Sequence, residues 1–71
     1  MTDSAALRKA VDESGLKYLK IADEMGISSY TLQKKIDNET EFKASEIVKL
    51  SALLSLNDAQ RSAIFFHQRS D

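Results

Sequence analysis

Apolar residues recur at spacings of three and four along most of this 71-residue chain, and no proline interrupts them. Leu7 and Val11 form one such pair, and Leu32 and Ile36 form another. Side chains at these spacings lie on one face of an α-helix, which can then turn that face toward a core. The pattern therefore predicts an all-α protein.

Two glycines and several polar residues mark where these helices should begin and end. Gly15 and Gly26 are the only glycines, and each suits the left-handed residue that closes a helix. Ser28 and Asn57 can accept hydrogen bonds from the first backbone N–H groups of a helix, and Gln60 can complete a capping box with Asn57. We therefore expect a single domain over residues 1–71, with helices at about 4–14, 17–25, 28–36, 44–54 and 57–67.

The same spacings predict which side chains form the core. Phe42 is the one aromatic residue in a polar segment, 37–43, and we expect its ring to pack against the core. In the last helix we expect Ala63 and Ile64 to face inward. Only one of Phe65 and Phe66 can join them, because neighbouring helical residues point in different directions. The main predicted core residues are Leu7, Val11, Ile21, Met25, Leu32, Ile36, Ile47 and Leu50.

Length and composition argue against several classes of function. A domain of this size buries only about 60% of the surface that its unfolded chain exposes, so little room is left for a closed pocket. We therefore expect no cofactor and no small-molecule substrate. Cysteine is absent and His67 is the only histidine, so we also expect no metal site. No nucleophile with a base at a known spacing and no glycine-rich phosphate loop occurs, so we expect no enzyme.

The chain also lacks features of membrane insertion and export. The first residues are not a basic segment followed by an apolar one, and no apolar run approaches the roughly 18 residues that a membrane helix needs. We expect a soluble, cytoplasmic protein that contacts no membrane. His67, close to the end of the chain, is expected to be exposed and without a role.

The overall charge argues against simple affinity for DNA. The formal net charge is −1 and the sequence pI is about 5.7, whereas nucleic-acid-binding domains often have a pI above about 9. A local basic patch can still occur on a neutral chain, so the distribution of charge matters more than its sum.

Residues 21–36, "IADEMGISSYTLQKKI", carry a pattern typical of two helices that cross at a tight corner. Such a crossing needs a small residue where the helices approach and a residue that tolerates positive φ at the corner. Ala22 and Gly26 meet these needs, and Leu32 follows at a position that can pack beneath the joint. Ile21, Met25 and Ile27 surround it with apolar surface. The segment therefore predicts a helix-turn-helix.

On these residues the chain resembles the lambda-repressor-like family of Cro and repressor helix-turn-helix proteins, over about residues 4–66. The segment "EFKASEIVKLSALLSL" is similar to the family's fourth helix with its preceding link. More narrowly, the chain resembles the small antirepressors of temperate phages called modulators of repression. The resemblance implies a compact five-helix bundle and a bacteriophage transcription regulator that acts, together with the phage repressor, in the choice between lysis and lysogeny.

The resemblance also implies where a partner or DNA would be contacted. In the family, the outward residues early in the third helix meet base edges in the major groove, and here these are Ser29, Tyr30, Gln33 and Lys34. Glutamine can bridge adenine and lysine can reach guanine, each good bidentate contact discriminating by roughly 1–3 kcal/mol. Contacts to phosphates or to the rim of an interface would come from Lys17, Tyr18, Thr31, Lys35, Asn38 and Lys43.

Two departures from the family pattern weaken the transfer of these roles, although a phosphate could offset the first. Lys17 stands where relatives often place a serine or threonine cap, and its charge beside the positive end of the helix dipole costs about 0.3–1 kcal/mol. The larger departure is an acidic loop, Asp37, Glu39 and Glu41. A carboxylate about 7 Å from a phosphate is repelled by roughly 0.6 kcal/mol in water before screening. Between residues 17 and 43, five lysines are balanced by five acidic side chains, so counterion release would be weak.

Two mechanisms remain open. The first is an antirepressor that binds the phage repressor protein, with or without operator double-stranded DNA. The second is a Cro-like dimer that binds operator DNA directly through the major groove. We expect the first because the charge balance favours a protein surface over a polyanion.

Overall fold

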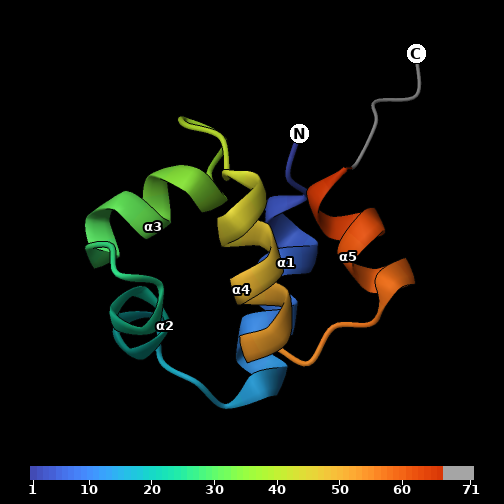
Figure 1. Cartoon of the computed structure of the whole chain (residues 1–71), viewed down its shortest axis with the longest axis horizontal. Helices are drawn as coiled ribbons and strands as arrows, with labels where there is room; N and C mark the ends of the chain where they lie inside the picture. Colours follow the sequence, from blue (N-terminus) through green and yellow to red (C-terminus); the bar gives the residue numbers. More distant parts are fainter. Residues whose placement is uncertain (67–71) are drawn as a thin grey trace.

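The computed structural model describes residues 1–66 and shows a compact arrangement of five helices, with no strand in that range. The helices are α1 (Ser4–Ser14), α2 (Tyr18–Met25), α3 (Ser29–Ile36), α4 (Ala44–Leu53) and α5 (Asp58–Phe65). In Figure 1, α2 and α3 lie on one side of α4, and α5 lies on the other. The all-α prediction is confirmed. His67 and the predicted end of the last helix lie outside the described residues.

Local side-chain chemistry accounts for most helix ends. The Ser28 hydroxyl accepts from Thr31 N at 3.0 Å, and Asn57 and Gln60 form the predicted reciprocal capping box at 2.8 and 2.9 Å. Lys17 precedes α2 without a side-chain cap, as expected for a residue that cannot accept a hydrogen bond. Gly15 and Gly26 close α1 and α2 with φ of 75° and 72°. These ends depend on residues close in sequence, which is why they could be predicted.

The core lies where the inward faces of the helices meet. α1 contacts α3 and α5, while α2 contacts α3 and α4, and α4 also contacts α5. Phe42 packs against this core as predicted, and its ring meets that of Phe65 edge-on at 5.3 Å. Phe65 is buried and Phe66 exposed, whereas Ala63, predicted to face inward, is exposed. The buried apolar residues are Leu7, Val11, Ile21, Ala22, Leu32, Ile36, Ile47, Leu50, Leu54, Ile64 and Phe65.

The first residues of the chain tie the end of α3 to α5. Asn38 accepts from Thr2 N at 2.9 Å and donates to Thr2 O at 2.8 Å, and Asp3 N donates to Ile64 O at 2.7 Å. Asn38 has φ of 63°, a left-handed conformation that asparagine tolerates better than most residues. Among residues 1–66, no helix combines the length and apolar character needed to cross a membrane.

Candidate recognition surface on α3

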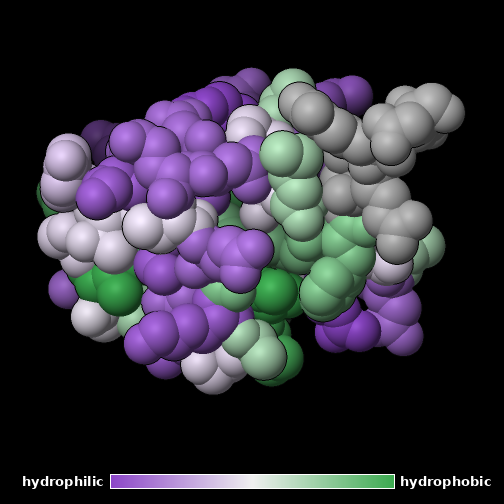
Figure 2. Space-filling view, turned by 90° about the horizontal axis from the view of Figure 1, so that it is seen from above, coloured by the Kyte–Doolittle hydropathy of each residue, from purple (hydrophilic) through white to green (hydrophobic). Residues whose placement is uncertain are grey.

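The outer face of α3 carries the residues predicted for recognition. Tyr30 is the most exposed large hydrophobic residue of the described chain, at 74%, and Lys34 Nζ lies 5.5 Å from its ring centroid. Ser29 and Gln33 are half-buried on the same helix. Figure 2 looks onto this side of the molecule, where hydrophilic residues gather over α3 and apolar ones lie further toward α5. A cation over a tyrosine ring stabilises an exposed side chain by about 0.5–1 kcal/mol, which favours a defined position for both groups.

The start of α3 is held by its own cap. Ser28 Oγ accepts from Thr31 N and donates to Thr31 Oγ1 at 2.9 Å. The Thr31 side chain was predicted to contact phosphates or an interface rim, and the structure places it half-buried beside Ser28. Both groups therefore fix where α3 begins, which sets the direction in which Tyr30 and Gln33 point.

Lys35, predicted to contact phosphates or the rim of an interface, is instead turned into the bundle. Its side chain is only 9% exposed, and Nζ lies 3.1 Å from Glu46 Oε1 and donates to Glu41 O at 3.0 Å. The physical reason is helical spacing, since Lys35 lies three residues after buried Leu32 and next to buried Ile36. Lys35 thus joins α3 to the start of α4 and cannot reach a phosphate or a partner from this position.

Glu46 serves two groups at once. Its carboxylate accepts from Lys43 N at 2.7 Å, at the start of α4, and pairs with Lys35. Burial raises the pKa of Glu46, but the hydrogen bonds from the Lys43 backbone and from Lys35 lower it by more, so the net shift is downward. Neither role was predicted, although a glutamate three residues into a helix is a known capping signal.

Arg8 is a part of the surface that sequence reasoning missed. It extends from α1 to α3, where Nη1 donates to Gln33 Oε1 at 3.2 Å and Nη2 lies 2.6 Å from Asp37 Oδ1. Its guanidinium also lies 5.9 Å from the centroid of the Tyr18 ring. The hydrogen bond to Asp37 raises the pKa of Arg8. No local signal marks this contact, because the partners are 25 and 29 positions away.

The remaining predicted rim residues take different positions. Lys17 and Lys43 are exposed, and Tyr18 is half-buried beside Arg8. Asn38 was predicted to contact phosphates, but its side-chain amide is already bonded to the backbone of Thr2. Its residue is exposed, yet its amide is used to hold the N-terminal segment. The structure thus gives Asn38 a different role within the fold.

The acidic loop is only partly an unbalanced negative patch. Asp37 pairs with Arg8, while Glu39 and Glu41 are exposed. With Lys35 withdrawn into the interior and Arg8 added, this face and its rim carry four cationic and three anionic side chains. They are Arg8, Lys17, Lys34 and Lys43, and Asp37, Glu39 and Glu41. The charges therefore nearly balance, although the set of residues differs from the predicted one.

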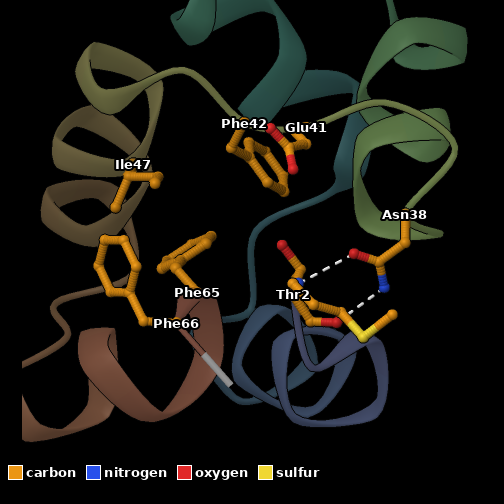
Figure 3. A pocket seen from close by; sticks show the side chains of 8 residues that line it. Thr2, Asn38, Glu41, Phe42, Ile47, Phe65 and Phe66 are labelled. Atoms are coloured by element: carbon orange, nitrogen blue, oxygen red, sulfur yellow. Dashed lines mark hydrogen bonds between the residues drawn. The ribbon is translucent and has the colours of Figure 1, made fainter. Parts of the chain in front are cut away.

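A second feature of this end of the molecule is a cleft of about 330 Å³ beyond the end of α3. Figure 3 shows Phe42, Ile47 and Phe65 along it, with the paired Thr2 and Asn38 across from them. Phe66 and Met1 also line it and are 59% and 60% exposed. The cleft thus has apolar residues on one side and polar ones on the other, where Thr2 and Asn38 bond to each other and Glu41 is exposed.

Within residues 1–66, no group of three or more metal-ligating side chains comes together. No protein-family model matches the chain, and no curated protein and no solved structure matches it either.

Proposed function

We propose that this chain is a helix-turn-helix transcription regulator of the phage type that binds a phage repressor protein through the outer face of α3. The observation that carries the proposal is the composition of that face. It presents an exposed tyrosine among charges of both signs that nearly balance. Tyrosine combines a large apolar ring with a polar tip and is enriched in protein interfaces.

The helix-turn-helix assignment is supported by how α2 meets α3. Ala22 is 1% exposed where the helices approach, and Gly26 turns the chain in the left-handed region. Ile27 N then donates to Ala22 O at 3.0 Å. These features agree with the small residue and the permissive corner on which the family resemblance rests.

A protein partner is favoured over DNA by the position of the cations. DNA affinity depends on cations that neutralise phosphates and release counterions. Lys35, one of the two lysines expected to help, is buried and paired with Glu46. Lys34 remains, but Glu39 and Glu41 are exposed in the loop that follows. A basic surface, such as a repressor presents to its operator, would meet these carboxylates favourably, so the proposed regulator would mask that surface.

Direct operator binding by a Cro-like dimer is the second candidate. It is favoured by Gln33 and Lys34, which are side chains suited to reading base edges and stand together on one short helix. In that case the acidic loop would have to lie away from the DNA backbone.

The deciding experiment titrates the purified protein with the repressor encoded beside this gene and, separately, with an operator duplex. The proposal expects a complex with the repressor at micromolar concentration without DNA, weakened by Tyr30→Ala and left intact by Val48→Ala, an exposed apolar residue of α4. The proposal is wrong if no such complex forms. A shift of the duplex by the protein alone, with affinity falling as salt rises, would establish the Cro-like mechanism instead.

A further inference from the structure

Arg8 links three groups that belong to, or border, the outer face of α3. Its two terminal nitrogens contact Gln33 and Asp37, and its guanidinium lies near the Tyr18 ring. The Arg8 side chain is 40% exposed, so it lies at the boundary between the bundle and the solvent. A planar guanidinium that holds two neighbours at once restrains both of them.

The chemistry of arginine determines how Gln33 is oriented. A guanidinium has five N–H donors and no acceptor, so only the oxygen of the Gln33 amide can face it. The Gln33 oxygen therefore points to Arg8, and the amide nitrogen is directed elsewhere. Among residues 1–66, no group accepts a hydrogen bond from that nitrogen. This orientation follows from which groups can donate, and does not depend on how the amide atoms are assigned.

Asp37 keeps Arg8 in place. The 2.6 Å contact joins the C-terminal end of α3 to α1, and the carboxylate compensates the guanidinium charge. Without that compensation, Arg8 would favour extension toward solvent or toward any anion. The pair thus makes Arg8 a local support for Gln33 rather than a general anion site.

We propose that Arg8 is a positioning residue that turns Gln33 so that its N–H donors meet an oxygen acceptor on the repressor. This inference rests on the proposed function, because it concerns the same face of α3. The matching group on the partner is a carboxylate or a backbone carbonyl beside the place that Tyr30 and Lys34 contact. Arg8 acts through Gln33 and makes no contact of its own that binding requires.

The first test needs no partner. The side-chain amide signals of Gln33 in a nitrogen-15 NMR spectrum should move in Arg8→Met, since methionine has no donor for Gln33 Oε1. Gln60, whose oxygen accepts from Asn57 N, provides an internal reference that should not move. The matched control is Arg61→Met, which removes an ion pair to Asp58 from an arginine that is 38% exposed. Unchanged Gln33 signals in Arg8→Met would overturn the inference.

The second test is a double-mutant cycle on repressor binding, with thermal unfolding measured for every variant. Because one hydrogen bond is at stake, Arg8→Met and Gln33→Ala should each weaken binding by roughly tenfold. The double variant should be no weaker than Gln33→Ala, because Arg8 has nothing left to position. Arg8→Lys, which keeps the charge but not the planar guanidinium that contacts two groups at once, should restore little, and Arg61→Met should bind normally.

The outcomes separate this inference from the proposed function. Additive losses in the double variant would mean that Arg8 contacts the partner itself, and the positioning role would be wrong. Failure of the unaltered protein to bind repressor would overturn the proposed function. In that case the NMR comparison still decides whether Arg8 orients Gln33.

Discussion

Lys34 and Lys35 are adjacent in sequence but should respond to substitution in opposite ways. Lys35 is held between Glu46 and the Glu41 carbonyl, with its side chain 9% exposed. Lys34 lies over Tyr30 on the outer face. We therefore compare Lys35→Met with Lys34→Met, because methionine keeps a long flexible side chain while removing the charge.

The expected loss for Lys35→Met follows from its two contacts. A hydrogen bond to a charged group contributes about 1.5–3 kcal/mol, and breaking a buried ion pair costs roughly 3–5 kcal/mol. Glu46 keeps its bond from Lys43 N, so the lower end applies and we expect about 3 kcal/mol. A chain of this length has a free energy of unfolding of about 4–11 kcal/mol. The substitution therefore removes a large share of stability and should lower Tm by roughly 12–24 °C.

The assay is urea unfolding followed by circular dichroism at neutral pH. Lys35→Met should lower the midpoint with little change in slope, which indicates a change in stability rather than in the denatured state. Lys34→Met should lower the free energy of unfolding by no more than about 1 kcal/mol, the upper value for an exposed cation over an aromatic ring, yet weaken repressor binding, because the cation that holds the Tyr30 ring is lost. Equal stability of the two variants would refute the reasoning that Lys35 is an internal link.

Three further predictions concern acid stability, the core and the charge balance. The lowered pKa of Glu46 means that its contribution is fully present above about pH 4.5, the ordinary pKa of a glutamate, and is lost as pH falls through the lower pKa of the folded protein. In the same unfolding assay, the stability difference between the unaltered protein and Lys35→Met should therefore narrow in acid, and a constant difference would argue against the pairing. Phe42→Ala should lower the free energy of unfolding by about 2–3 kcal/mol, because the ring is half-buried and meets Phe65 edge-on. A decrease in the free energy of unfolding below about 0.5 kcal/mol, the range of ordinary surface substitutions, would show that Phe42 does not pack against the core. Changing Asp37, Glu39 and Glu41 together to asparagine or glutamine should raise nonspecific DNA affinity several-fold in a low-salt titration. No rise would show that the loop lies away from bound DNA.

Much of the fold could be predicted because its signals are local. Gly15 and Gly26 end helices where only a residue tolerant of positive φ fits easily. Asn57 and Gln60 cap a helix through bonds that span three residues. The spacing of Leu32 and Ile36 likewise placed both in the interior. In each case, the geometry of a single helix is enough to decide the outcome.

The candidate site was less accessible to this reasoning. Lys35 was assigned to the rim because of its place in the helix-turn-helix pattern, although its spacing from Leu32 already placed it on the inner face. The spacing signal was present, but the compensating Glu46 that makes burial tolerable comes from another helix. The charge of a side chain is thus a poor guide to its burial when the oppositely charged partner lies on another helix and cannot be identified from the sequence.

The sequence by itself determined the helices, their ends and most of the core, since these depend on residues within one or two turns of each other. Only the tertiary structure decided that Arg8 supports Gln33 and Asp37, and that Asn38 holds Thr2. These contacts join residues 25 to 36 positions apart. They exist because packing brings separate helices and the N-terminal segment together, and no spacing within a single helix encodes that arrangement.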